Sequence, residues 1–295
     1  MRKRKRDKLL LSVGFLLPAY VFVFFAFLIP GIWNIVLSFQ EWDGFHEKEF
    51  VFLDNYRKAF GDALFLRSLK NSVMIAVITM IGATLLGLFL AMMIYRLGKK
   101  EGAFYRLIIF MPSMIPVSII GLLFTFIFNS DMGLLNQLLR LIGLENLTTA
   151  WLENSATVLW CIIFVGIWRL LGMPMMLCFV ALQEVPSTLL EAGKMDGATY
   201  RQQMTHILLP LIRPTIGLSM IFVLLNAFKT YDLVYVLTKG GPANLSMTVP
   251  IYMQKTAFTY SKFSYSSTMG VLMAVVVIAV VLVTKRVMKG ESYEF

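Results

Sequence analysis

Several stretches of this sequence stay apolar for about 20 residues, the length that a helix needs to cross a lipid bilayer. The 295 residues are 58% hydrophobic and only 15% charged, whereas soluble domains are typically about a quarter charged. Backbone polar groups in lipid must be satisfied within the segment, so apolar runs of this length are expected to be helices. The alternating segments of about ten residues that build a membrane β-barrel are absent from the sequence. The sequence therefore predicts an all-α, polytopic membrane protein.

The apolar runs predict six transmembrane helices, at residues 10–38, 70–95, 105–128, 156–182, 214–237 and 266–285. Together they form a membrane domain over residues 10–285, between a basic N-terminal segment, 1–9, and a tail, 286–295. The first run is too long for a signal peptide and has no small-residue cleavage site, so it is expected to remain as a span. Prolines interrupt three of the runs. Kinks in packed helices are the ordinary explanation, and hinges along a transport pathway are the alternative.

The basic residues predict the orientation of the chain. Most of the 27 lysines and arginines lie before the first run or in connections on that same side, and the opposite connections hold many acids. Because lysine and arginine accumulate in cytoplasmic loops, both termini and the polar segment 183–213 are expected to be cytoplasmic. The net charge of +10 is thus assigned to the inner face of the membrane rather than to nucleic acid. In the outer connection 129–155, leucines at helical spacing predict a short amphipathic helix on the outer surface.

Sequence motifs for catalysis are absent. The chain has no G-x-x-x-x-G-K-[ST] phosphate-binding loop, no H-E-x-x-H zinc motif and no G-x-S-x-G nucleophile motif. Its two histidines, His46 and His206, fall in predicted loops, so neither a metal site nor an intramembrane hydrolase is favoured. We expect a non-catalytic protein that itself binds no cofactor and no metal.

Away from the ends of the predicted spans, three charged residues remain at membrane depth: Arg169, Lys229 and Asp232. Charge at membrane depth is costly, so these side chains are expected to face a protein interior or water. For Arg169, a role in a solute pathway or between helices is favoured over packing alone. For Lys229, a pathway role weighs the same as reaching the interface or pairing with Asp232. Asn226 and Tyr231 add hydrogen-bonding and stacking groups to this candidate pathway.

The polar segment between the fourth and fifth runs is patterned. Thr188 and Glu191 have the spacing of a capping box, which predicts the start of a short helix. Asp196-Gly197 is a turn signal that ends this helix, and residues 198–209 can form a second helix. Two short helices that meet at a glycine turn would form a compact cytoplasmic projection, which another protein can grip.

Within this segment the chain resembles the permease subunits of binding-protein-dependent ABC importers. Their signature is E-A-A, three residues, G, nine residues and I-x-L-P; here it reads Glu191-Ala192-Gly193, then Gly197, then Ile207-Leu208-Leu209-Pro210. A glycine at 193 replaces the alanine that is usual at the third position of E-A-A, which would loosen the first helix by up to about 1 kcal/mol. The chain is also similar to the carbohydrate-uptake branch, near the larger maltose permease subunit and the glycerol-phosphate permease. That similarity lies at residues 52–56, 60, 71–72, 228–229, 232–238 and 240–242.

The resemblance implies a type I ABC importer permease fold and a place in a larger machine, in the plasma (inner) membrane of a bacterium or archaeon. A second homologous permease would complete the pathway as a heterodimer. Two copies of an ATP-binding subunit, which carry the ATP and Mg²⁺, would dock on the cytoplasmic side, and an extracytoplasmic solute-binding protein would deliver a sugar. Another polar solute, such as glycerol phosphate or a polyol, is the alternative. A stand-alone secondary transporter fits less well, because only Asp232 offers a carboxylate for a coupling ion within the spans.

The resemblance also assigns roles within the helix-turn-helix at 187–209, through which the ATPase would move this chain. Glu191 would meet a polar or basic group of the ATPase, Gly197 would permit the turn, and Ala192 and Ala198 would allow close approach. Bulky side chains would fill a groove on the ATPase: those of Leu189, Met195, Tyr200 and Met204. The predicted coupling residues are Leu189, Glu191, Ala192, Asp196, Gly197, Ala198, Tyr200, Met204, Ile207 and Pro210.

Overall fold

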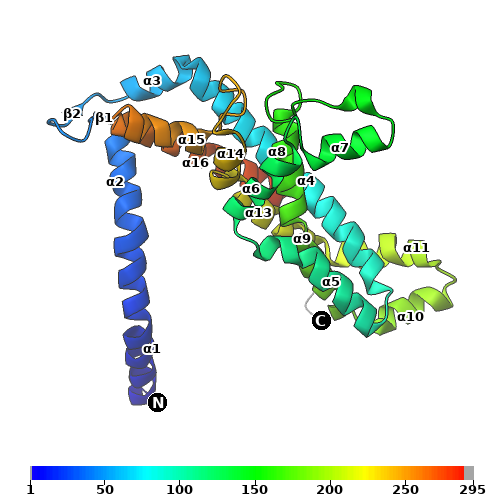
Figure 1. Cartoon of the computed structure of the whole chain (residues 1–295). Coiled ribbons are helices and arrows are strands. Elements are labelled where there is room, and N and C mark those ends of the chain that lie inside the picture. Colours follow the sequence, from blue (N-terminus) through cyan, green and yellow to red (C-terminus); the bar gives the residue numbers. More distant parts are fainter. Residues whose placement is uncertain (1, 289–295) are drawn as a thin grey trace. The chain divides into compact units, whose positions relative to one another are not determined.

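The computed structural model describes the backbone of residues 2–288 and the side chains of residues 13–288. It is mostly helical, and the chain divides into two compact units (Figure 1). The first unit comprises residues 1–63 and 253–272, and the second comprises residues 64–252 and the chain from residue 273 onward.

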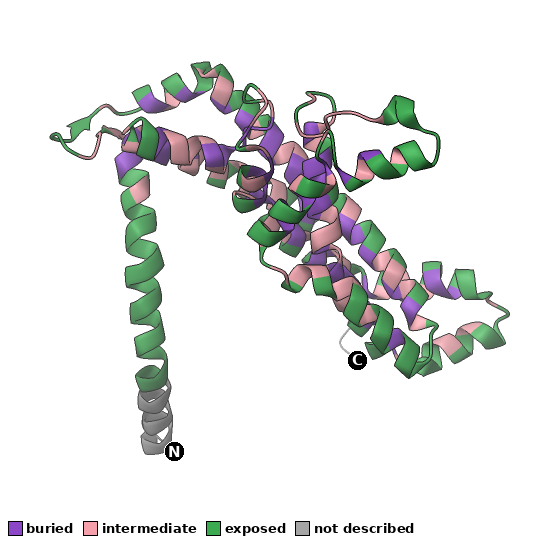
Figure 2. Cartoon of the chain, in the orientation of Figure 1, coloured by how far each residue is buried: buried purple, intermediate pink, exposed green. Residues whose placement is uncertain are grey.

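The first unit begins with one long helical stretch, made of α1 (Arg2–Val23), the π-helical η1 (Phe24–Leu28) and α2 (Ile29–Ser38). Its apolar part, Val13–Ser38, is long enough to cross a membrane, and none of its most apolar window is buried. Figure 2 shows the segment Val13–Ser38 exposed until its last turns. The first predicted span is therefore confirmed as a helix of spanning length.

A small hairpin and further helices complete the first unit. Their bounds are β1 (Gln40–Glu41), antiparallel to β2 (Glu49–Phe50), then α3 (Asp54–Gly61), the end of α15 (Val249–Gln254), the π-helical η4 (Lys255–Thr259) and the start of α16 (Phe263–Val287). Asn55 Nδ2 fixes α3 to the end of α2 by donating to the carbonyl oxygens of Ser38 at 3.2 Å and Gln40 at 2.7 Å. Thr268 Oγ1 also donates to the Ser38 carbonyl, at 3.1 Å, so the two segments of this unit meet at Ser38.

The second unit contains the remaining helices. In chain order these are α4 (Ala63–Tyr95), α5 (Lys99–Met114), α6 (Val117–Ile127), α7 (Leu134–Leu141), the 3-10 turn η2 (Glu145–Leu147), α8 (Val158–Leu170), α9 (Gly172–Glu184), α10 (Ser187–Met195), α11 (Tyr200–Gln202), the π-helical η3 (Gln203–Leu208), α12 (Leu209–Leu211), α13 (Arg213–Phe228) and α14 (Asp232–Thr238). Three buried apolar clusters hold them together. One joins α6, α8 and α14, the second joins the end of α4 to α9 and η3, and the third joins α4, α13 and α16.

Glycines allow close helix contact at two places in the second unit. A Cβ at Gly87 of α4 would lie 2.8 Å from the Leu171 carbonyl oxygen and 2.8 Å from the Met175 nitrogen. A Cβ at Gly172 would lie 2.9 Å from the carbonyl oxygen of Ile109 on α5. Because small residues let the backbones of membrane helices approach each other, the start of α9 packs between α4 and α5.

The predicted spans agree with the structure in four cases. The helices Val13–Ser38, Ala63–Tyr95, Val158–Glu184 and Phe263–Val287 are long and apolar enough to cross a membrane. The second of these begins seven residues earlier than the predicted span 70–95. Two bent helix pairs pass the same test of length and composition only when each pair is taken as one span, which gives up to six spans among the described residues.

The predicted third span, 105–128, is wrong as a single helix, because α5 and α6 meet at an angle of 96°. The break falls at Ile115 and Pro116, where Ile115 is extended with φ −78° and ψ 135°. Proline lacks an N–H, and it disfavours the helical region for the residue before it. These two effects account for the break.

The predicted fifth span, 214–237, is also interrupted. Helix α13 ends at Phe228, and α14 begins at Asp232. Between them the Tyr231 N–H donates to the Lys229 carbonyl oxygen at 2.8 Å, which forms a tight turn in place of a helical bond. A second bend, of 67°, separates the helical segment Tyr200–Leu211 from α13.

The short helix predicted in connection 129–155 is confirmed as α7. Asn136 fixes it to the loop that follows: its Nδ2 donates to the Thr149 carbonyl oxygen at 3.0 Å, and its Oδ1 accepts from Trp151 Nε1 at 2.8 Å. Its place on the outer surface of a membrane stays a prediction.

Candidate functional site

The first helix of the predicted helix-turn-helix is α10. It begins at Ser187, directly after Pro186, whose fixed φ suits a helix start. The predicted capping box of Thr188 and Glu191 is wrong. No side chain within the described residues caps this end, and both residues already lie inside the helix.

The predicted turn at Asp196-Gly197 is confirmed in detail. Gly197 has φ +80°, in the left-handed region that glycine adopts at no steric cost. Its N–H donates to the Lys194 carbonyl oxygen at 3.0 Å, and the Ala198 N–H donates to the Gly193 carbonyl oxygen at 2.9 Å. These are the two bonds of a Schellman motif, which ends α10 and reverses the chain.

The second helix begins two residues later than predicted. Thr199 caps it in a true capping box: Thr199 Oγ1 accepts from the Gln202 N–H at 3.4 Å, and Gln202 Oε1 accepts from the Thr199 N–H at 2.8 Å. The helix then continues through α11, η3 and α12 to Leu211, beyond the expected end at residue 209. The T-x-x-Q pattern was visible in the sequence and is the signal that would have placed this start.

The two helices touch at Gly193. A Cβ at this position would lie 2.8 Å from Ile207 Cδ1. Gln203 Nε2 adds a bond to the Ala198 carbonyl oxygen, at 3.2 Å. The glycine that replaces the usual alanine of the motif therefore lets α10 lie against η3.

The predicted coupling residues are not all accessible. Ala198 and Ile207 are half-buried, and the exposed members are Leu189, Glu191, Ala192, Asp196, Gly197, Tyr200 and Pro210. Met204, which was expected to fill a groove on a partner, is only 5% exposed. It packs in the chain's own core with Ile94 of α4 and Leu182 of α9, because η3 turns it inward. The interpretation of Met204 as a docking side chain is therefore wrong.

Residues 187–211, from α10 to α12, thus have two distinct sides. Met204 and Leu208 attach η3 to the core, whereas Met195 at the end of α10 is 88% exposed. Arg96, directly after α4, stacks its guanidinium on the Tyr200 ring, with 4.5 Å between Cζ and the ring centroid. Sequence reasoning did not single out Arg96. Figure 1 shows α10 and α11 near the end of α4.

Four of the five candidate pathway residues lie together at the break between α13 and α14. Lys229 is exposed at the end of α13, and Asp232 is exposed at the start of α14. No ion pair joins these two side chains in the part of the chain that the structure describes. Asn226 Nδ2 donates to the Phe222 carbonyl oxygen at 2.9 Å, and the Tyr231 ring stacks on Tyr235 at 5.2 Å.

The fifth candidate, Arg169, lies at the end of α8, where Ser113 Oγ donates to its carbonyl oxygen at 2.9 Å. Its guanidinium interacts electrostatically with Asp232, which links it to the other candidates. Its Nε is buried without a hydrogen-bond partner among the described residues. Such a group retains hydrogen-bonding capacity that a polar solute can satisfy.

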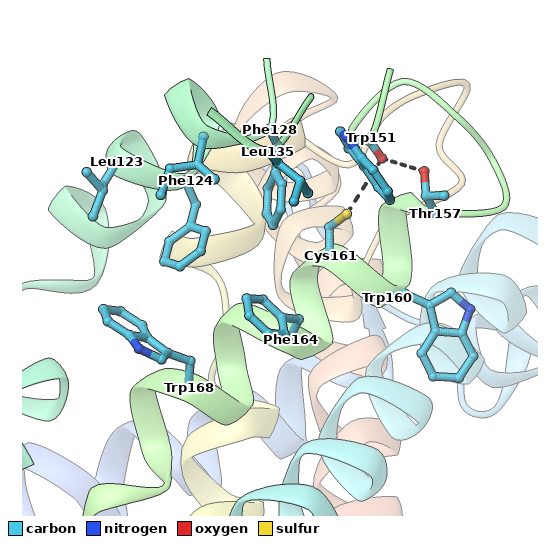
Figure 3. A pocket seen from close by; sticks show the side chains of 11 residues that line it. Leu123, Phe124, Phe128, Leu135, Trp151, Thr157, Trp160, Cys161, Phe164 and Trp168 are labelled. Atoms are coloured by element: carbon cyan, nitrogen blue, oxygen red, sulfur yellow. Dashed lines mark hydrogen bonds between the residues drawn. The ribbon is translucent and has the colours of Figure 1, made fainter. Parts of the chain in front are cut away.

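A cavity of about 580 Å³ lies beside this region, between α6, α7 and α8. Its lining is aromatic and apolar, and includes Phe124, Trp151, Phe164 and Trp168 (Figure 3). Figure 3 draws the hydrogen bond that Thr157 Oγ1 donates to the Trp151 carbonyl oxygen at 2.7 Å, so these two polar groups of the lining are paired with each other. None of the five candidate pathway residues lines this cavity.

Two polar residues near the start of α4 explain part of the sequence similarity. Asn71 Nδ2 donates to the carbonyl oxygens of Leu245 at 2.8 Å and Met247 at 2.9 Å. Ser72 Oγ accepts from the Val249 N–H at 3.0 Å. These bonds fix the segment that follows residues 240–242 onto α4.

Helices of spanning length, with an exposed helix-turn-helix between two of them, define a membrane-embedded transport subunit. Residues 83–289 match the family described as the binding-protein-dependent transport system inner membrane component, and the chain belongs to this family. It is therefore a permease subunit of an ABC importer, and the family consists of non-catalytic membrane subunits.

Similar proteins agree with this assignment. The chain is 37% identical to the probable ABC transporter permease protein YurN of Bacillus subtilis, over 95% of this chain and 96% of that protein. It is 32% identical to the diacetylchitobiose uptake system permease protein NgcF of Streptomyces coelicolor, over 99% of this chain and 87% of that protein. Its fold is similar to a chain of a bacterial ABC transporter that imports alginate, with TM-score 0.81, 23% identity and 97% of both chains covered. The expected permease fold is confirmed.

Proposed function

We propose that this chain forms half of the translocation pathway of an ATP-driven carbohydrate importer, and that residues 187–211 couple it to the ATPase subunits. These residues are called the coupling segment below. The observation that carries the proposal is the two-sided construction of this segment. Met204 and Leu208 anchor it in the core, while Glu191 and Met195 present an exposed helix face to a partner.

The proposed assembly contains a second homologous permease, two copies of an ATP-binding subunit and an extracytoplasmic solute-binding protein. ATP and Mg²⁺ bind to the ATPase subunits, and this chain binds no cofactor. The exposed apolar surface of Val13–Ser38 suits contact with lipid or with the companion permease. The distribution of lysine and arginine supports a cytoplasmic position for the coupling segment and for both termini.

A carbohydrate is the favoured solute. Similar permeases are named for the uptake of diacetylchitobiose, of starch degradation products and of multiple sugars. The alginate transporter that shares the fold also has a structure in complex with a pentasaccharide-bound periplasmic protein. The proposed role of the coupling segment would be the same if the solute were glycerol phosphate or a polyol.

An acidic carbohydrate is a second candidate, and the specific observation that favours it is Arg169. Its buried Nε has no hydrogen-bond partner among the described residues, and Lys229 is a second positive charge among the pathway candidates. A guanidinium can hold a carboxylate by two parallel hydrogen bonds. The transporter with the similar fold imports an acidic polysaccharide.

The test is solute-stimulated ATP hydrolysis by the complete transporter in proteoliposomes, with its solute-binding protein outside. Neutral oligosaccharides, uronic-acid oligosaccharides and amino acids are supplied in turn. Stimulation by one of the two carbohydrate sets supports the proposal, and stimulation by amino acids alone contradicts it. If the solute is acidic, Arg169→Gln should lower stimulation by about tenfold or more, since bonds to charged groups are worth about 1.5–3 kcal/mol. Arg169→Lys keeps the charge and should retain part of the activity.

A further inference from the structure

The end of α4 and the start of α11 are joined by one stacking contact. Arg96 directly follows α4, and Tyr200 is the first residue of α11. The Arg96 guanidinium carbon lies 4.5 Å from the centroid of the Tyr200 ring, within the range of about 6 Å for an attractive cation–π contact. The Arg96 N–H donates to the Met93 carbonyl oxygen at 3.3 Å, which ties Arg96 to the last turn of α4.

The stack itself, rather than an ion pair, holds Arg96 in place. No acidic side chain forms a salt bridge with Arg96 among the residues whose side chains the structure describes. Tyr200 is 41% exposed, so Arg96 covers part of the ring and the rest stays accessible. A planar guanidinium can stack on a ring, and a lysine ammonium cannot reproduce that geometry.

Buried apolar contacts lie next to this stack. Ala91 and Ile94, on the last turns of α4, pack in the same cluster as Met204 and Leu208 of η3. The second helix of the coupling segment is therefore attached to α4 at two places, one apolar and one through Arg96. The first helix, α10, is attached to the second through the contact between Gly193 and Ile207.

Helix α4 connects this attachment point to the opposite end of the second unit. It is continuous over 33 residues, which at 1.5 Å per residue gives about 50 Å. Near its start, Asn71 and Ser72 bond to the backbone of residues 245–249. A displacement of the coupling segment can thus reach residues 245–249 through one unbroken helix.

We propose that Arg96 is a positioning residue for coupling: its stack on Tyr200 holds the coupling segment to the end of α4, so that movement imposed on α10 is delivered to α4. The inference rests on the proposed function, because it requires an ATPase to move α10. It adds that α4 is the element that receives this movement and that a guanidinium at position 96 is required for full transfer.

The experiment compares matched substitutions in the complete transporter, reconstituted in proteoliposomes. The measured quantity is solute taken up per ATP hydrolysed. Tyr200→Leu, which removes the ring, should lower this ratio about two- to fivefold, the weight of an exposed cation–π contact. Arg96→Lys keeps the charge but loses the planar guanidinium, so it should lower the ratio by a smaller factor. Tyr200→Phe keeps the ring and should lower the ratio less than Tyr200→Leu does. The double variant Arg96→Lys/Tyr200→Leu should be no worse than the stronger single variant, because both changes remove the same contact.

A second cation–π pair supplies the control. Arg106 lies over the Phe179 ring at 4.2 Å, a contact that joins α5 to α9 and does not involve Tyr200. Arg106→Lys should leave uptake per ATP near that of the unmodified protein. An equal loss in Arg106→Lys would overturn the specific role of Arg96, as would an unchanged ratio in Arg96→Lys or an equal loss in Tyr200→Phe.

Crosslinking of Met195→Cys to the ATPase, measured in parallel, separates the two proposals. If the crosslink forms and Arg96→Lys stays fully coupled, the inference on Arg96 fails and the proposed function stands. If the crosslink does not form in the otherwise unmodified transporter, the proposed function fails. If Arg96→Lys does not assemble, the two Tyr200 variants test the inference instead. Higher uptake per ATP in Tyr200→Phe than in Tyr200→Leu supports it, and equal uptake per ATP contradicts it.

Discussion

Gly197 is the residue at which backbone geometry constrains the coupling segment most. Its φ of +80° lies where side-chain-bearing residues are strained, and a Cβ there would meet no atom within 4 Å. A substitution therefore acts through the backbone alone, without a steric clash. The left-handed conformation costs roughly 1–2 kcal/mol for an ordinary residue, and asparagine tolerates it better than most.

We predict that Gly197→Val lowers uptake per ATP several-fold, because valine disfavours the turn that sets the angle between α10 and α11. Insertion and the amount of assembled transporter should stay unchanged, since no packing contact is lost. Gly197→Asn is the matched control and should remain close to the unmodified protein. Full coupling in Gly197→Val would show that this turn is not needed to transmit movement.

At the scale of elements, the packing of α4 against the junction of α8 with α9 requires a residue without a side chain at position 87. A Cβ at Gly87 would lie 2.8 Å from two backbone atoms, those of Leu171 and Met175, which cannot rotate away. Adding atoms to a packed interface typically costs about 1–3 kcal/mol. We predict that Gly87→Ala lowers the thermal unfolding midpoint of the purified protein in detergent.

Gly61→Ala provides the comparison for this prediction. A Cβ at Gly61 would meet no atom within 4 Å, and the residue lies in helix α3 with an ordinary backbone conformation. Its midpoint should be unchanged or slightly raised, because alanine favours helix over glycine. Equal midpoints for the two variants would mean that α4 and α9 do not pack at Gly87 in the membrane protein.

The sequence predicted these elements unevenly, for physical reasons. Apolar runs identify spans because lipid imposes a minimum length on a helix, and four of the six spans form single helices of that length. Pro116 signalled a kink, but the 96° angle between α5 and α6 depends on what each helix packs against. The break at Lys229 has no glycine or proline to announce it, and it is set by tertiary contacts of α14 with α6 and α8.

In the candidate site, too, features set by a few neighbouring residues could be predicted from the sequence, and features set by tertiary packing could not. The Asp196-Gly197 turn was predictable because a left-handed residue and its bonds are encoded within a few positions. The capping box at Thr199 was equally local and was overlooked. The burial of Met204 was not predictable from spacing, because the π-helical turn of η3 decides which way that side chain points.

At the scale of the whole molecule, one part of the chain is moved by the partner and another part responds. The coupling segment is exposed on α10 and anchored through η3, and α4 leads from that anchor to residues 245–249. Coupling of two distant sites requires an element whose position both sites influence. In this chain the continuous helix α4 is that element.

The most direct measurement is site-specific crosslinking of α10 in the active transporter, with Met195→Cys as the reporter. Met195 is 88% exposed at the end of α10, whereas the native Cys161 and Cys178 are buried. Met132→Cys, at a position 80% exposed in the connection between α6 and α7, is the matched control. We expect Met195→Cys to crosslink to the ATPase subunit and Met132→Cys not to do so. A transporter that takes up solute while Met195→Cys never crosslinks to the ATPase, or while Met132→Cys crosslinks equally well, would contradict the account.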